Sequence, residues 1–278
     1  MTFHFARTAK AAIAALLICA MPLAPAIARE PDDGGVKIGS PSLLRKLYPA
    51  ERMERTATLQ YTQLKGQAEA KHALIHLPDE RARRVRKIAE DLLPHAVKFN
   101  ERARDWKWEV NVINSKTINA FCMPGGKIVV FTGIIDKLNL TDDELAMVMG
   151  HEIAHALREH ARARAAKGML TNVGVLAVGV LVGNGAGELA RVSGGLLNLK
   201  FSRGDETDAD LVGMELAARA GYDPRAGITL WEKMSAAAKG APPEWFSTHP
   251  AGSTRVDTIK THLNEVLPLY EKAKARKS

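Results

Sequence analysis

Apolar and polar positions along the chain follow two periodicities, which separate helical segments from extended ones. Alternation with a period of two over 108–113 and a β-branched run over 127–131 predict strands of a small antiparallel sheet. Helical spacing and helix-end signals predict helices over 48–66, 78–105, 205–221, 225–238 and 253–274, with a further helix starting near 142. The predicted fold class is therefore α+β and mainly helical, with the sheet beside the helix that starts near 142.

The N-terminal residues have the pattern of an export signal. Arg7 and Lys10 precede an apolar run over 11–21, and Ala26-Ile27-Ala28 supplies a small-x-small cleavage site. The apolar run is short for a bilayer core of about 30 Å, so cleavage is favoured over a retained anchor. We therefore predict an exported protein with a signal peptide over 1–28, a leader and helical extension over 29–77, and one principal domain over 78–278.

The charge distribution narrows the range of partners. The 278 residues carry a formal net charge of +8, and much of the excess lies in basic runs over 81–87 and 158–167. Apolar or small residues interleave both runs, as on solvated helix faces, and no aromatic residues accompany them as a nucleic-acid groove would require. A peripheral contact with an anionic membrane surface is the open alternative. Once Cys19 leaves with the signal peptide, Cys122 stands alone, which predicts a buried thiol and no internal disulfide.

A His-Glu-x-x-His motif lies in the helix predicted to start near 142. Thr141 and Glu144 have the Thr-x-x-Glu spacing of a capping box at its start. His151 and His155 are four residues apart and differ by only about 40° around a helix axis, so both imidazoles face one point. Two neutral imidazoles on one face suit zinc, and Glu152 is placed to act as a general base toward an attacking water.

A catalytic zinc also needs a third protein ligand and an open coordination position. Glu206 and Asp210 are four residues apart and share a helix face, so one can bind metal while the other accepts the ring N–H of a ligand histidine. Asp205 and Asp208 belong to the same acidic stretch, which is also typical of an ordinary helix N-terminus. From the residues alone, Glu206 is thus one candidate ligand and Asp210 a candidate supporting residue.

Four motifs in a fixed order resemble those of a known family. They are His151-Glu-Ile-Ala-His155, Ser202-Arg-Gly-Asp-Glu206-Thr-Asp-Ala-Asp210, Asn119-Ala-Phe-Cys-Met-Pro-Gly-Gly126, and Ser247-Thr-His-Pro250 with Arg255. Together they resemble the zinc metallopeptidase family of HtpX, the CAAX prenyl proteases and the Oma peptidase. Within that family the chain is most similar in type to the periplasmic BepA and LoiP members.

The resemblance implies a gluzincin metallopeptidase domain over 78–278 with one zinc ion per chain. The implied residues are the metal ligands His151, His155 and Glu206, the supporting Asp210, and the catalytic Glu152, His249 and Arg255. His249 is expected near the metal, where it could donate a hydrogen bond to the oxyanion. Without the resemblance, His249 reads as a loop histidine at a proline turn and Arg255 as a solvated side chain.

The predicted substrate is a polypeptide. The run 128–131, next to the metal helix, predicts an exposed edge strand to which an extended peptide can add by main-chain hydrogen bonds. Substrate contacts are therefore expected at Asn119, Ala120, Phe121, Ile128, Val129 and Val130. The predicted function is a zinc endopeptidase of the periplasm that hydrolyses unfolded or misassembled envelope proteins. A non-proteolytic zinc-binding chaperone or interaction module is the alternative, although the intact Glu152 argues against a structural zinc.

The stretch 168–199 connects the two ligand-bearing helices. Its apolar, glycine-rich sequence predicts either a buried core hairpin or a mobile lid that covers the zinc cleft or rests on a membrane. The pattern does not decide between these two interpretations, and it does not predict an oligomeric state.

Overall fold

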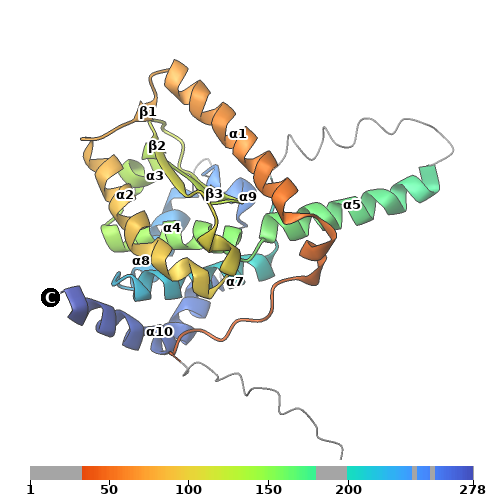
Figure 1. The fold of residues 1–278 in the computed structure, drawn as a ribbon. Coiled ribbons are helices and arrows are strands. Elements are labelled where there is room, and N and C mark those ends of the chain that lie inside the picture. The colour runs from red at the N-terminus through yellow and green to blue at the C-terminus, as the bar shows by residue number, and fades with distance from the viewer. Residues whose placement is uncertain (1–32, 180–198, 240–242, 251–253, 278) are drawn as a thin grey trace, which may run out of the picture. The chain divides into compact units, whose positions relative to one another are not determined.

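The computed structural model describes residues 33–179, 199–239, 243–250 and 254–277. Its elements in chain order (Figure 1) are η1 (Leu43–Leu47), α1 (Ala50–Ala70), β1 (Leu74–Ile75), α2 (Glu80–Leu92), η2 (Leu93–Lys98), η3 (Glu101–Arg104), β2 (Glu109–Ile113), β3 (Ala120–Met123), β4 (Lys127–Phe131), α3 (Thr132–Leu138), α4 (Asp142–Leu157), α5 (His160–Gly179), α7 (Arg203–Arg219), α8 (Ala226–Ala237), α9 (Trp245–Thr248) and α10 (Arg255–Lys277). The predicted α+β class is confirmed. The predicted signal peptide lies outside the described residues, and the domain boundary at 77 and 78 stays a prediction.

The four strands form a mixed sheet in the order β1-β2-β4-β3. β1 and β3 run antiparallel to their neighbours, whereas β2 and β4 are parallel, so the predicted antiparallel sheet is wrong in that respect. The cause is the tight turn after β3. Gly125 and Gly126 have φ angles of 84° and 80°, which glycine adopts readily, and the resulting hairpin places β4 between β2 and β3.

The strand order also corrects the predicted edge. β4 is paired on both sides, and Ile128, Val129 and Val130 are buried. An uninterrupted β-branched run is typical of a strand that is covered on both faces, and a strand with two neighbours has no free main-chain groups to offer a peptide. β3, and not β4, is the free edge on this side of the sheet.

The helix predicted over 78–105 divides into α2 and two 3-10 helices. Pro94 explains the break, because proline has no amide hydrogen with which to continue the α-helical hydrogen bonds of α2. The helix predicted near 142 is confirmed as α4, whose capping box joins Thr141 and Glu144. α7 likewise begins with a capping box, formed by Ser202 and Asp205.

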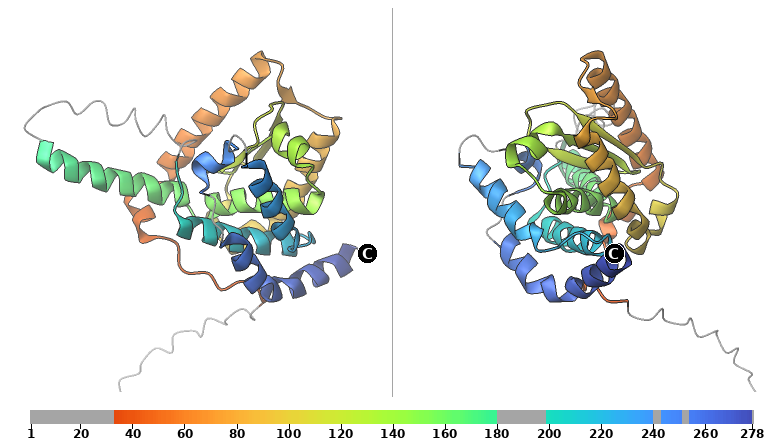
Figure 2. Two further views of the ribbon diagram at one scale, coloured as in Figure 1. Left: turned by 180° about the vertical axis from the view of Figure 1, so that it is seen from behind. Right: turned by 90° about the vertical axis from the view of Figure 1, so that its left-hand side faces the viewer.

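The core is layered around α4. α4 packs against β3 on one side and against α7 on the other, and α7 in turn packs against α10 (Figure 2). α1 covers the other face of the sheet, where Ala57 and Tyr61 contact Ile113 and Val129. All residues of α4 from Glu144 to Leu157 are buried. The His-Glu-x-x-His motif therefore lies at the centre of the molecule rather than on its surface.

Two residues separate α4 from α5, which packs against η1. The predicted stretch 168–199 begins inside this helix, and residues 180–198 lie outside the described residues. The basic runs on α2 and α5 form ion pairs within the chain, among them Arg81 with Asp136, Arg84 with Asp142, Arg158 with Asp208, and Arg164 with Asp205. Much of their charge is thus compensated by the chain itself.

Candidate metal centre

α4 and α7 cross at two glycines. A Cβ atom at Gly150 would lie 2.6 Å from the carbonyl oxygen of Gly213, and a Cβ atom at Gly213 would lie 2.6 Å from the amide nitrogen of His151. A side chain at either glycine would therefore push the two helices apart. The close crossing brings the histidine motif of α4 against the acidic first turns of α7.

Four buried side chains at this crossing offer ligand atoms within 4.8 Å of one another: His151, His155, Glu206 and His249. The Nε2 atoms of His151 and His155 are 3.1 Å apart, and Glu206 places Oε2 3.5 Å from the first and Oε1 3.5 Å from the second. Donor atoms around a tetrahedral zinc ion are about 3.3 Å apart, because zinc–nitrogen bonds are about 2.0 Å long. The donor set fits a single zinc ion.

His249 enters the cluster from the C-terminal end of α9. Its Nδ1 atom is 3.1 Å from Glu206 Oε1 and 3.4 Å from His151 Nε2. The Trp245 ring stacks on the His249 imidazole with 4.6 Å between centroids, which fixes its plane. His249 is therefore a fourth potential donor and not only a neighbour of the cluster.

Asp210 and Arg255 support the cluster from behind. Asp210 Oδ1 is 3.0 Å from His151 Nδ1, the ring nitrogen that faces away from the other donors. The Arg255 guanidinium donates to Asp210 Oδ2 at 2.6 Å and to Glu206 Oε2 at 2.6 Å, and it lies 3.6 Å above the Trp231 ring. Arg255 is buried beside the cluster, where the family resemblance puts it, and the alternative of a solvated side chain is wrong.

The protonation states of His155 and Glu206 suit metal binding. Burial, with the nearby charges of His151 and His249, holds the pKa of His155 well below its usual range, so this imidazole is neutral. Burial disfavours the anion of Glu206, but hydrogen bonds with His151 and His249 outweigh this effect and lower the pKa of its carboxyl. Burial and Arg255 oppose protonation of His151, yet its hydrogen bonds to Asp210 and Glu206 raise its pKa to about 9. A divalent cation would take the place of that proton.

Glu152 is the one carboxylate beside the donors that has an unused oxygen. Its Oε1 atom is buried without a hydrogen-bond partner among the described residues, and lies 3.4 Å from His249 Nε2. Burial raises the pKa of Glu152, although His249 and His151 act against this shift. A carboxyl group of raised pKa that faces a donor cluster is suited to accept a proton and release it again.

β3 runs beside α4, and the Cys122 backbone lies against Glu152 of the motif. The carbonyl groups of Asn119 and Met123 accept hydrogen bonds from Phe131 and Gly126, so these residues face β4. Because main-chain groups alternate along a strand, those of Ala120 and Cys122 point to the free edge. The Asn119 side chain caps the Ala120 amide at 2.9 Å.

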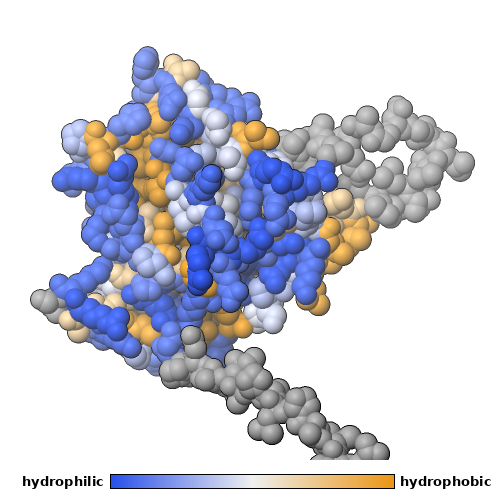
Figure 3. Space-filling model, viewed as in Figure 1, coloured by the Kyte–Doolittle hydropathy of each residue, from blue (hydrophilic) through white to orange (hydrophobic). Residues whose placement is uncertain are grey.

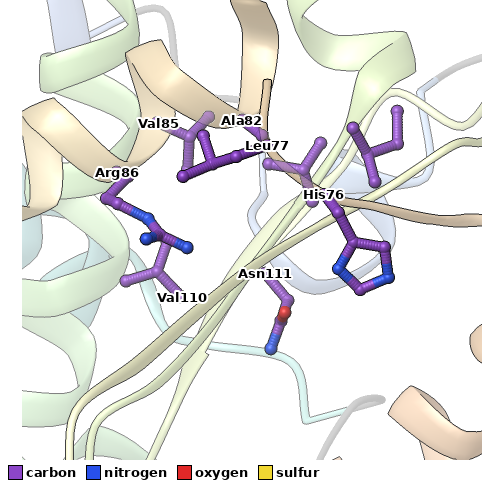
Figure 4. A pocket seen from close by; sticks show the side chains of 9 residues that line it. His76, Leu77, Ala82, Val85, Arg86, Val110 and Asn111 are labelled. Carbon is purple, nitrogen blue, oxygen red and sulfur yellow. The ribbon is translucent and has the colours of Figure 1, made fainter. Parts of the chain in front are cut away.

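A pocket of about 260 Å³ lies elsewhere, between α2 and the strands β1 and β2 (Figure 4). His76, Arg86 and Asn111 are among its lining residues, and no residue of the donor cluster lines it. The residues of the cluster are at most 4% exposed. The pocket is therefore not the route to the candidate ligands.

The sequence model of Peptidase family M48 matches residues 79–263, which is more than half of the chain. The chain belongs to peptidase family M48. This confirms the family that the four motifs predict, and it places the donor cluster inside the matched region. The cluster is accordingly a candidate M48 metallopeptidase centre.

Curated relatives of this M48 chain come from mitochondria and from bacteria. Mitochondrial metalloendopeptidase OMA1 of Arabidopsis thaliana is 39% identical over 173 residues, which cover 60% of this chain and 34% of that protein. Mitochondrial metalloendopeptidase OMA1 of Schizosaccharomyces pombe is 40% identical over 58% of this chain and 48% of that protein. Metalloprotease LoiP of Escherichia coli is 30% identical over 55% of this chain and 62% of that protein. The chain thus matches between a third and two thirds of the length of these relatives.

The M48 centre also contains residues that sequence interpretation missed. Phe201 stacks on the His155 ring with 4.0 Å between centroids, His160 Nδ1 lies 2.9 Å from His155 Nδ1, and Asp208 in turn contacts His160. The sequence offered one signal for this contact, which is that His160 follows the motif by only five residues. Helical spacing argues against such a contact, and only the break between α4 and α5 makes it possible.

Proposed function

We propose that the chain is a zinc-dependent endopeptidase that hydrolyses unfolded or misassembled polypeptides of the bacterial envelope. The observation that carries the proposal is a Glu152 oxygen that has no hydrogen-bond partner among the described residues and lies beside a donor set that fits zinc. A structural zinc site needs no such base, whereas peptide hydrolysis does.

Each residue of the cluster has a proposed role. His151, His155 and Glu206 would hold one zinc ion, which supplies Lewis-acid polarisation of the scissile carbonyl and acidifies water when bound. Glu152 accepts the proton of the attacking water and passes it to the leaving amine. His249 donates a hydrogen bond to the developing negative charge on the carbonyl oxygen. Arg255 holds the carboxylates of Glu206 and Asp210 in place and does not itself reach the substrate.

The free edge of β3 is the proposed substrate-binding element. An extended peptide would pair with the outward main-chain groups of Ala120 and Cys122, after displacing the Asn119 side chain from the Ala120 amide. Such pairing uses main-chain hydrogen bonds and tolerates many side chains. It also requires an extended substrate, which favours unfolded chains over folded ones.

His249 gives the non-proteolytic alternative its one specific support. With four protein donors around the metal, no coordination position would be open, as in a structural zinc site. In our proposal His151, His155 and Glu206 hold the metal and His249 donates to the carbonyl oxygen instead, so one coordination position stays open. A protein in which His249 also binds the metal would hold zinc without cleaving peptides.

Digestion of unfolded casein tests the function. We expect the purified protein to degrade reduced casein, to lose that activity in a chelator, and to regain it with added zinc. A folded globular protein of similar size is the control substrate and should resist, because it offers no extended segment to β3. A zinc-loaded protein that leaves casein intact would support the non-proteolytic alternative instead.

The proposed location is the periplasm, with a peripheral membrane contact. The export signal of the sequence supports it, as does the similarity to bacterial relatives such as LoiP and the Beta-barrel assembly-enhancing protease of Yersinia pestis, although the OMA1 relatives are mitochondrial. No helix within the described part of the chain is long and apolar enough to span a membrane. Any membrane contact through these residues would therefore be made at the surface.

The helices η1 and α5 carry the surface that supports a peripheral contact. Leu43 and Leu47 of η1 are 71% and 57% exposed, and Leu170 of α5 is 50% exposed. Figure 3 shows apolar surface on the side of the molecule where these two helices lie. Exposed leucines beside basic residues such as Lys46 are suited to the headgroup region of an anionic membrane.

Fractionation of cells tests location and contact together. We expect the wild-type protein in the periplasmic membrane fraction, and we expect Leu47→Ser to shift it toward the soluble periplasmic fraction. Leu59→Ser is the matched control, because Leu59 is 73% exposed but lies on α1. A cytoplasmic wild-type protein would contradict the location, and equal effects of the two substitutions would contradict the contact.

A further inference from the structure

The second histidine of the motif has a partner on the side opposite the donor cluster. His155 Nδ1 is 2.9 Å from His160 Nδ1, and His160 Nε2 is 3.1 Å from Asp208 Oδ2. His160 is 5% exposed, so water does not replace these contacts readily. The three side chains form a continuous hydrogen-bonded row that ends at the candidate metal ligand His155.

A break in the helix creates this contact. Residues five apart in an uninterrupted helix are rotated by about 140°, so His155 and His160 would face different sides. α4 ends at Leu157, and Glu159 has a left-handed φ of 56° before α5 begins at His160. Ion pairs of Glu159 with Arg45 at 2.9 Å and Arg162 at 2.6 Å hold this uncommon conformation. The turn points His160 back at the metal helix.

The hydrogen-bond roles along the row follow from the donor cluster. His155 offers Nε2 to the cluster, so its proton lies on Nδ1 and is donated to His160 Nδ1. His160 Nδ1 is then the acceptor, and its proton lies on Nε2 and is donated to Asp208. Arg158 fixes the Asp208 carboxylate from the other side, with Nε 2.6 Å from Oδ2. One assignment of protons satisfies every member of the row.

We propose that His160 and Asp208 are positioning residues that orient His155 for zinc, as Asp210 orients His151. The inference rests on the proposed metallopeptidase function, because it requires zinc at the cluster, but it does not depend on which substrate is cleaved. α7 would then supply the ligand Glu206, the carboxylate of Asp210 for His151, and the carboxylate of Asp208, which acts on His155 through His160. A histidine that donates to an oriented acceptor is a stronger metal ligand, and loss of such an acceptor weakens metal binding by about 10- to 100-fold.

Zinc affinity of the full chain, measured by competition with a chromophoric chelator, tests this role. We expect His160→Phe to weaken zinc binding by about 10- to 100-fold, because phenylalanine fills the space without accepting the His155 proton. His160→Asn should retain most of the affinity, since its amide oxygen replaces Nδ1 as acceptor. His262→Phe is the matched control: His262 also lies 2.8 Å from a carboxylate, that of Glu265, but it sits on α10 away from the cluster.

A double-mutant comparison separates positioning from general loss of structure. Asp208→Asn should weaken zinc binding in the wild-type background and add little in the His160→Phe background, because both substitutions interrupt one row. The absorption spectrum of the cobalt-substituted protein should shift in His160→Phe and return toward wild type in His160→Asn. Unchanged zinc affinity in His160→Phe, or independent effects of the two substitutions, would overturn the proposal. A wild-type protein that binds zinc but cleaves no polypeptide would overturn the proposed function alone.

Discussion

Replacement of Glu152 by glutamine is expected to leave zinc bound and to slow casein hydrolysis by about 100-fold or more. Glu152 is not one of the four cluster donors, so its charge is not needed to hold the metal. Its Oε1 atom lies 3.4 Å from His249 Nε2 without a hydrogen-bond partner among the described residues, so an amide fits the same space. The amide cannot take the proton of an attacking water.

The measurement is a comparison of zinc content and casein turnover in the same preparation of Glu152→Gln. Glu265→Gln is the matched control, because Glu265 also has a buried, unpartnered carboxylate oxygen but lies on α10. Wild-type turnover by fully zinc-loaded Glu152→Gln would show that the proton acceptor is another group. Such a result would leave the four-donor metal site unaffected, but it would contradict Glu152 as the general base.

Loss of Glu206 should have the largest effect on metal binding. Glu206→Ala removes a donor that lies 3.5 Å from both motif histidines, and it leaves the buried guanidinium of Arg255 with one carboxylate fewer. Asp210 alone then offsets the Arg255 charge, and this excess of positive charge opposes a divalent cation. Loss of a residue that only supports a ligand weakens metal binding by up to about 100-fold. We expect the loss of Glu206, a ligand itself, to lower zinc affinity by more than that.

Asp210→Asn provides the comparison for Glu206→Ala. The asparagine oxygen can still accept the His151 ring N–H, so zinc affinity should fall by only about 10- to 100-fold. Isothermal titration with zinc measures both variants, and circular dichroism of the metal-free proteins verifies that each is folded. Equal zinc affinity in Glu206→Ala and the wild type would exclude Glu206 as a ligand.

The sequence predicts those parts of the fold that local chemistry determines. The capping box at Thr141 fixes the start of α4, and the spacing of His151 and His155 places both imidazoles on one face of that helix. Glu206 and Asp210 share a face of α7 for the same reason. In each case the residues that interact are within one or two helical turns of each other. Helical periodicity is sufficient for such predictions.

The remaining features depend on contacts that periodicity does not describe. The apolar run of β4 indicates a strand, but its neighbours depend on the turn at Gly125 and Gly126, and the predicted edge was therefore wrong. Arg255 reads as a surface residue until α10 packs against α7 and buries it with Asp210. Ring stacking and ion pairs between distant segments do not follow a regular residue spacing, so sequence periodicity cannot predict them.

The first turn of α7 has a consequence for how this protein can change during evolution. Ser202 and Asp205 cap that turn through their own side chains and main-chain amides, so the phase of the helix is set locally. The positions of Glu206 and Asp210 around the axis therefore do not depend on the number of residues that precede Ser202. Insertions and deletions between the two ligand-bearing helices can accumulate without rotating the carboxylates away from the histidines.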